Sequence, residues 1–170
     1  MKLVGAAAIL LGSLLAALTQ LNAEKTREET RRALRRSLIL LRNELYERQT
    51  ILPEAFPGLA GASGCEAAQG FYVFLSEEMR QLGERSFSAI WRDCAGKKLA
   101  MLDEEDTEAI ASLGTTLGGS ELELQCAALE KCADTLERKS AQCAAERAEK
   151  RRMTLGVTIS LGAFVIILLI

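Results

Sequence analysis

Two uncharged apolar stretches, one near each end of the chain, constrain its fold more than any other feature. The first, Leu3 to Ala23, has twenty-one residues, and the second, Met153 to Ile170, has eighteen. At about 1.5 Å of rise per residue, a helix of either length can cross a hydrocarbon core of roughly 30 Å. Lipid offers no hydrogen-bond partners, so a spanning segment must satisfy its own backbone. The sequence therefore predicts transmembrane helices at residues 1–23 and 153–170, with one domain over residues 24–152.

Basic residues next to these stretches indicate on which side of the membrane the middle domain lies. Lysine and arginine resist translocation, whereas acidic residues have little influence. Only Lys2 lies on the outer side of the two stretches, and twelve basic residues flank them on the side of the middle domain: Lys25, Arg27, Arg31, Arg32, Arg35, Arg36, Arg138, Lys139, Arg147, Lys150, Arg151 and Arg152. We therefore expect a two-pass protein of the cell membrane with its middle domain in the cytoplasm.

A second interpretation of the first stretch stays open. A basic start at Lys2, an apolar run and a small residue at Ala23 also describe a cleavable signal peptide. Leu21, at the third position before such a cut, fits the usual small-x-small rule poorly, so we favour an uncleaved anchor. Cleavage would place the middle domain outside the cell, which would suit a membrane-tethered sensor or receptor.

The composition argues against several classes of function. The chain has no histidine, hence no Ser-His-Asp or Cys-His arrangement and no HExxH metal motif, and it has no phosphate-binding glycine loop. Five cysteines without a CxxC pair favour buried, reduced thiols over disulfides or zinc. The nearly balanced 21 basic and 23 acidic residues give no support for nucleic-acid binding. We therefore expect no enzyme activity, no cofactor and no metal.

Helical periodicity dominates the middle domain, and alternating strand patterns are nearly absent. One helical face carries leucines at steps of four, three and four: Leu34, Leu38, Leu41 and Leu45. Another carries apolar residues at every seventh position: Leu122, Leu129, Leu136 and Cys143. We expect the first of these helices to continue from the first span to about Arg48, and the second to run into the last span. The predicted fold class is all-α, a helical bundle between two terminal transmembrane helices.

Capping residues divide the segment between the two long helices. We expect four helices there, over residues 53–59, 65–82, 86–96 and 104–117, with Trp91 in the core. Pro53 and Glu54 suit the first turn of the first helix, and a glycine-rich loop follows it. Two S-x-x-E capping boxes, Ser63–Glu66 and Ser120–Glu123, predict helix starts. Ser86 and Asp103 are predicted caps, and Gly118–Gly119 a left-handed stop.

Several segments, taken together and in order, resemble the stage III sporulation protein AB family. They follow the amino-terminal anchor: LILLRNELYERQTILPEAFPGLA, FYVFLSEEM, LGTTLGGSELELQ and MTLGVTISLGAFVIILLI. The family's LPEA segment corresponds to Leu52, Pro53, Glu54 and Ala55, and its LGxxLG segment to Leu113, Gly114, Leu117 and Gly118. Gly119 and Ser120 then depart from the bulkier or charged residues usual there, which leaves the turn in question.

This resemblance implies a function, because the family is similar to the cytoplasmic helical domains of the inner-membrane platform protein of type II secretion systems. It implies a non-enzymatic assembly platform in the mother-cell membrane facing the forespore, within a secretion-like channel apparatus required for endospore formation. The implied partners are a cytosolic ATPase and other membrane components of the apparatus, and a homo-oligomer is possible.

Four arginines close to the first predicted span are the candidate contact residues: Arg31, Arg32, Arg35 and Arg36. They would meet either an acidic partner or anionic lipid. We favour lipid, because basic residues beside a span are attracted to an anionic membrane surface.

Overall fold

The chain is helical over nearly all of its length. The computed structural model describes the backbone of residues 2–169 and the side chains of residues 19, 20 and 22–148. Over that backbone only short connections and one isolated bridge, between Leu82 and Arg85, interrupt the helices. The predicted all-α class is therefore confirmed. The chain forms two compact units, Met1–Leu136 and Glu137–Ile170, and the second unit consists of the later part of the last helix.

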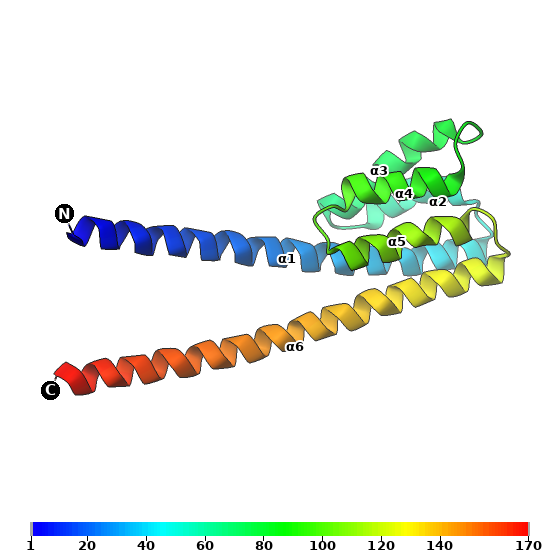
Figure 1. Cartoon of the computed structure of the whole chain (residues 1–170). Coiled ribbons are helices and arrows are strands. Elements are labelled where there is room, and N and C mark those ends of the chain that lie inside the picture. Colours follow the sequence, from blue (N-terminus) through cyan, green and yellow to red (C-terminus); the bar gives the residue numbers. More distant parts are fainter. Residues whose placement is uncertain (1, 170) are drawn as a thin grey trace. The chain divides into compact units, whose positions relative to one another are not determined.

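Two very long helices and four short ones make up the described backbone. They follow one another in the order shown in Figure 1: α1 (Lys2–Arg48), α2 (Leu52–Ala62), α3 (Glu66–Glu78), the 3-10 turn η1 (Met79–Gln81), α4 (Phe87–Lys98), α5 (Glu104–Leu117) and α6 (Leu122–Leu169). Both α1 and α6 run without a break between the predicted spans and the middle domain, as expected from the sequence. Arg48 is also the predicted end of α1.

The two predicted membrane spans lie mostly or wholly beyond the side chains that the structure describes. Residues 3–23 fall largely outside them and residues 153–170 fall outside completely. Among the described residues, no helical stretch has both the length and the apolar character that a bilayer crossing requires. The spans and the topology derived from them stay predictions.

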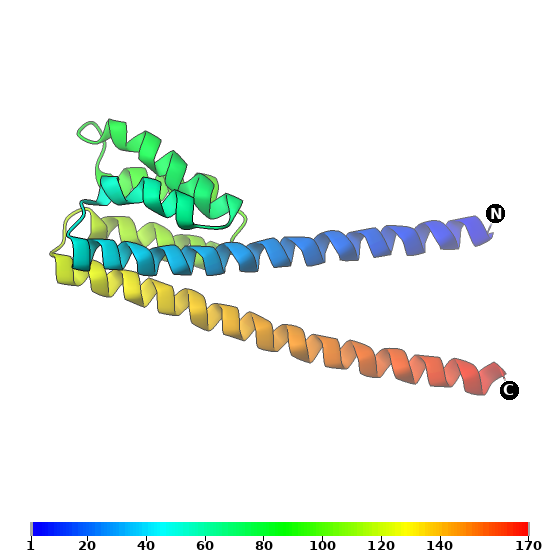
Figure 2. The same cartoon turned by 180° about the vertical axis from the view of Figure 1, so that it is seen from behind.

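Within the first unit the helices are stacked in layers. The carboxyl-terminal half of α1 lies beside α5; α2, α3 and α4 cover this layer on one side, and the start of α6 covers it on the other (Figures 1 and 2). The predicted leucine face of α1 is buried throughout, at 4% exposure or less. On α6, Leu129 and Leu136 are buried as expected, whereas Leu122 is 39% exposed because it begins the helix at the edge of the bundle.

An aromatic cluster forms the centre of the core. Its rings belong to α2, α3 and α4, with centroids 5.0–6.5 Å apart: Phe56, Phe71, Tyr72, Phe87 and Trp91. Trp91 is fully buried, which confirms its assignment to the core, and its indole N–H donates to the carbonyl oxygen of Ile110 at 2.7 Å. The Tyr72 hydroxyl is 2.8 Å from Ser37 Oγ, which itself donates to Leu34 O. Each buried polar group in this cluster thus ties two helices together.

Several predicted helix boundaries are wrong. Helix α2 continues through the expected glycine loop to Ala62, because Leu59 and Ala60 are buried against the core. Ser63 does not cap α3; its hydroxyl donates back to Ala60 O at 2.9 Å, and α3 begins after Cys65. That helix also ends earlier than predicted, at Glu78.

The turn between α5 and α6 also differs from the prediction. Helix α5 ends at Leu117 as expected, but Gly118 has φ −83°, so the stop is not left-handed. The Gln125 amide holds the turn instead, donating to Leu117 O at 3.1 Å and to Ser120 O at 2.9 Å. Helix α6 begins at Leu122, one residue after the start that a cap at Ser120 predicts. At α4 the predicted cap is confirmed, since Ala89 N–H donates to Ser86 Oγ.

The cysteines are thiols, and most of them are shielded. Cys94, Cys126 and Cys132 are buried, whereas Cys65 and Cys143 are partly exposed. Burial raises the pKa of Cys94 to about 11 and that of Cys132 to about 12. Since the thiolate is the reactive form, these two side chains are chemically quiet at neutral pH.

We expect a maleimide at pH 8 to modify Cys65 much faster than Cys94 or Cys132 in the folded chain. Peptide mass spectrometry over a time course measures the three rates, and denaturant should make them similar. Equal rates in the folded chain would contradict this packing.

The raised pKa values also predict how the free energy of unfolding depends on pH. The contribution of these thiols to stability is fully present below the pKa of an unfolded thiol, about 8.5, and it declines at higher pH because the unfolded state loses its protons first.

Candidate functional site

A buried ion-pair cluster joins α1 to the start of α5. Its central residue, Arg31, is 2% exposed. Its guanidinium lies 2.7 Å from the carboxylate of Asp106 in α5 and 3.1 Å from that of Asp103, the N-cap residue of α5. It also lies 2.9 Å from the carboxylate of Glu28 in α1. Arg27 adds a second contact with Asp103 at 2.8 Å and also donates to Met101 O. Three carboxylates in hydrogen-bonding range of one guanidinium satisfy a charge that would be costly to bury alone.

This cluster corrects two expectations from the sequence. Asp103 occupies the N-cap position of α5, but its side chain makes no capping bond and is directed to the arginines instead. Arg31 was predicted to contact a partner or lipid, yet its burial and its three ion pairs make it a structural residue. The signal in the sequence is the acidic run at residues 103–106, which supplies both Asp103 and Asp106 to the cluster.

The other candidate arginines lie nearer the surface, although they do not form one uniform face. Arg32 is exposed and pairs with Glu28 at 2.7 Å, Arg35 is half-buried, and Arg36 is exposed. Arg32 and Arg36 line an open depression of about 870 Å³, together with Lys98, Cys65 and two glutamates. Because this depression carries both signs of charge, it suits a polar surface contact better than a specific anion site.

A second hollow, of about 510 Å³, opens where α1 ends and α6 begins. We call it the tip groove, and its apolar wall comes from four separate segments: Ile51, Leu52, Pro53, Leu82, Leu117 and Leu122. Ile51 is 59% exposed and Leu82 is 50% exposed, so the groove is continuous with apolar surface. Such residues are ordinary when scattered, but apolar surface gathered around a hollow is typical of an interaction site.

The backbone at the tip groove is strained. Gln49, which lines the groove, has φ +52°, the left-handed conformation that non-glycine residues seldom adopt. Helix α1 ends at this conformation, and just beyond it Thr50 N–H donates to Glu44 O, six residues back, at 3.1 Å. Strained residues of this kind concentrate at functional sites.

The LPEA and LGxxLG segments of the family resemblance both contribute to this end of the bundle. Leu52, Pro53, Leu117 and Gly118 line the tip groove, although the two pairs are far apart in the sequence. Leu113 and Gly114 are buried one turn below, where Gly114 lies against Trp91, and Glu54 is exposed beside Pro53. The sequence identified these positions but did not predict that they would meet.

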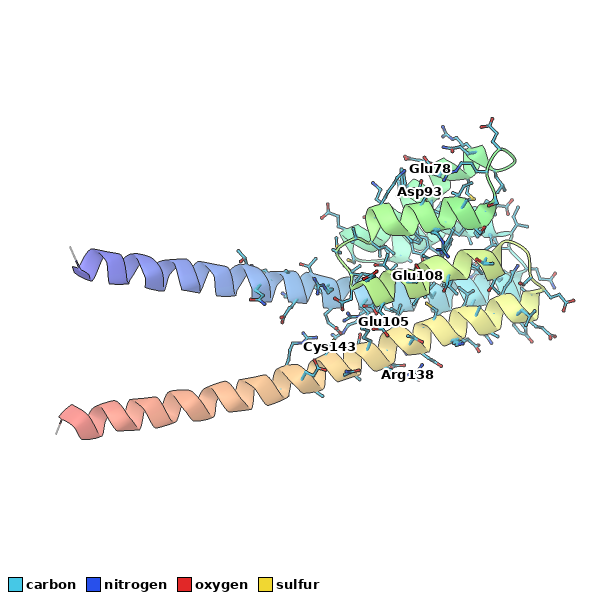
Figure 3. All side chains as sticks on the ribbon, in the orientation of Figure 1. Glu78, Asp93, Glu105, Glu108, Arg138 and Cys143 are labelled. Carbon is cyan, nitrogen blue, oxygen red and sulfur yellow. The ribbon has the colours of Figure 1, made fainter. Side chains whose placement is uncertain are left out.

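Three basic residues, at the end of α1, before α4 and in α4, are engaged by neighbouring carboxylates. Arg48 pairs with Glu44 at 2.8 Å. Arg85 lies 3.5 Å from both Glu78 and Asp93, which are labelled in Figure 3. Lys97 donates to Asp93 at 2.9 Å and thereby lowers the pKa of that carboxyl. No group of three potential metal ligands occurs among the described residues.

Comparisons with known proteins agree on one family. The sequence profile of stage III sporulation protein AB matches residues 2–170. A solved structure of a stage III sporulation protein AB has a similar fold, with a TM-score of 0.63 at 23% sequence identity, over 74% of this chain and 97% of that one. A comparison with curated protein sequences gave no match. The match along nearly the whole sequence shows that this chain belongs to the stage III sporulation protein AB family.

Proposed function

We propose that this sporulation protein is a non-enzymatic membrane platform in a secretion-like channel apparatus between mother cell and forespore, and that its tip groove docks a cytosolic partner. The observation that carries this proposal is the tip groove itself, an exposed apolar hollow lined by residues of both the LPEA and the LGxxLG segments. A sporulation ATPase and other membrane components of the same apparatus are the proposed partners.

The length of α1 supports a platform role. From Ala23, the end of the predicted span, to Leu45 in the tip groove is 22 residues, or about 33 Å of helix. The groove would therefore stand well clear of the membrane surface, where a cytosolic protein can reach it. The depression lined by Arg32 and Arg36 lies on the part of α1 nearer the span, where anionic lipid is the proposed contact.

The fixed packing of the bundle also supports this role. The Arg31 cluster and the Tyr72–Ser37 hydrogen bond attach the short helices to α1, and Arg42 pairs with Glu130 of α6 at 2.9 Å. A load applied at the tip groove would thus be transmitted to both long helices, as an assembly platform requires.

Co-purification of the ATPase with the full-length chain tests the docking role. We expect Ile51→Ser combined with Leu82→Ser to abolish co-purification at unchanged expression, because both side chains lie exposed in the groove. Val73→Ser, which removes an apolar side chain of 43% exposure elsewhere, is the matched control and should have no effect. Normal co-purification of the groove variant would remove the tip groove from the proposed interface.

The same assay separates protein contact from lipid contact for the arginines. We expect Arg32→Glu combined with Arg36→Glu to retain the ATPase but to weaken binding to anionic vesicles. Loss of the ATPase with this variant would instead assign the arginines to the protein interface.

Labelling of Cys65 distinguishes the platform from an exported sensor or receptor. An impermeant maleimide should reach this thiol only after cells are permeabilised, because the proposed platform lies in the cytoplasm. Labelling of Cys65 in intact cells would favour the exported domain.

A further inference from the structure

We propose that the occupant of the tip groove is a basic amphipathic helix of the partner protein, with its apolar side chains in the groove and its lysines or arginines against the surrounding carboxylates. This inference rests on the proposed docking function and names the chemistry of the segment that docks. Recognition of an amphipathic helix by an apolar groove is a recurrent way in which helical proteins bind one another.

The charge around the tip groove carries the inference. The segments that form the groove hold five exposed glutamates without an ion pair among the described residues: Glu47, Glu54, Glu84, Glu121 and Glu123. Two of the basic residues of the same segments, Arg48 and Arg85, are already paired. Arg80 is the nearest exposed basic residue in sequence without a described ion pair. The segments that form the groove therefore carry more unpaired exposed acidic residues than basic ones, and a basic segment is complementary to that charge.

The same charge disfavours other occupants. An acidic peptide would bring like charges together, and a second copy of this chain docked groove to groove would place two sets of glutamates opposite each other. Such like-charge contacts oppose association, whereas the apolar wall alone would accept any hydrophobic segment. Charge thus decides among partners that the apolar surface cannot distinguish.

The groove also contains a built-in reporter. Phe87 lines the groove, and its ring is stacked on that of Trp91 at a centroid distance of 5.8 Å. Because Trp91 is the only tryptophan, a helix that presses on Phe87 should change the fluorescence of the whole protein.

The test uses the full-length chain in nanodiscs of phosphatidylcholine, a zwitterionic lipid. The probe is a synthetic helical peptide with leucines at i, i+3, i+4 and i+7 and lysines elsewhere. A matched peptide has glutamate at every lysine position, and protein-free nanodiscs measure binding to lipid. We expect the lysine peptide to bind, to change Trp91 emission and to bind more weakly as salt is added, and the glutamate peptide to bind at least about tenfold more weakly.

Two variants divide the apolar and the charged parts of the site. Ile51→Ser with Leu82→Ser, and Glu47→Lys with Glu84→Lys, should each weaken the lysine peptide about tenfold or more. Neither pair should harm folding, because Ile51 is the N-cap of α2, where serine is preferred, and a lysine at 47 lies favourably in the last turn of α1. Thermal unfolding checks this, and Val73→Ser and Asp134→Lys, both on exposed positions outside the groove, should bind normally.

Defined outcomes would overturn the inference. Equal binding of the two peptides, or binding that neither groove variant weakens, would show that charge or the groove does not select the occupant. A dimer in sedimentation that dissociates on Ile51→Ser with Leu82→Ser would assign the groove to a second copy. If the ATPase depends on the groove but the lysine peptide does not bind, the docking role stands and the inference fails; if the peptide binds but the ATPase never does, the proposed platform function fails instead.

Discussion

Replacing Arg31 with methionine is expected to lower the stability of the bundle by about 3–5 kcal/mol, because the change removes one member of a buried ion pair. Glu28 would still have Arg32, and Asp103 would still have Arg27. Asp106 would lose its ion pair with Arg31 while being 1% exposed, so most of the cost arises there.

Urea unfolding of the full-length chain, followed by Trp91 fluorescence, measures this effect. Arg32→Met is the matched control, and it should cost no more than about 1 kcal/mol because that side chain is 61% exposed. Adding Asp106→Leu to Arg31→Met should restore much of the stability, since both members of the buried ion pair are then replaced by apolar side chains. An unfolding curve of Arg31→Met that coincides with that of Arg32→Met would refute the cluster as a structural element.

Replacing Gly114 with valine is expected to cost about 3 kcal/mol, through steric conflict with Trp91. A Cβ atom at Gly114 would lie 2.8 Å from Trp91 Cβ and 2.9 Å from Cδ1 and Cγ, closer than such atoms approach in folded proteins. The indole cannot move away easily, because its N–H is bonded to Ile110 O and its ring is packed among the other aromatic residues.

Gly96 in α4 provides the matched control for this prediction. A Cβ atom there meets nothing within 4 Å, so Gly96→Val should be nearly neutral. Gly114→Ala should be intermediate, since alanine adds the conflicting atom but also favours the helix by about 1 kcal/mol over glycine. Urea midpoints and the emission wavelength of Trp91 would measure the series. Equal midpoints for the valine variants at 96 and 114 would show that the α4–α5 packing is looser than described.

These two sites bear on function because they hold the bundle together below the tip groove. Gly118 extends the close packing of α4 and α5 toward the groove, where a Cβ atom would lie 3.1 Å from Phe87. A loss of docking in a variant at Gly114 would therefore report distorted packing, whereas a loss with Ile51→Ser and Leu82→Ser would report the contact itself. The separation of these two effects is the reason for using exposed positions in the binding tests.

Local periodicity was enough to predict most of the secondary structure. The leucine stripe of α1 lies on one face because of helical geometry alone, and the structure buries all four leucines. Ser86 caps α4 because its hydroxyl reaches an N–H three residues later. Both features depend on residues within one or a few turns of the same helix, and the sequence pattern therefore predicts them.

Two helix ends differ from what the local sequence pattern predicts. Ser63 has the right spacing for a capping box, but a buried hydroxyl bonded to Ala60 O serves the end of α2 instead. Gln49 ends α1 in a conformation usual for glycine, and the next N–H, that of Thr50, donates to Glu44 O. Neither outcome follows from propensity, because competing hydrogen bonds at a helix end differ by only about 1 kcal/mol.

The sequence by itself determined the helical class, the two long helices, the place of Trp91 in the core and the family resemblance, because each depends on periodicity or on order along the chain. Only the tertiary structure decided that Arg31 is buried against Asp106, 75 residues away, while Arg32 stays exposed one position further along α1. It also decided that the segments around Pro53 and Leu117 form one groove. Burial and charge pairing depend on which surfaces meet in space, and no local pattern records that meeting.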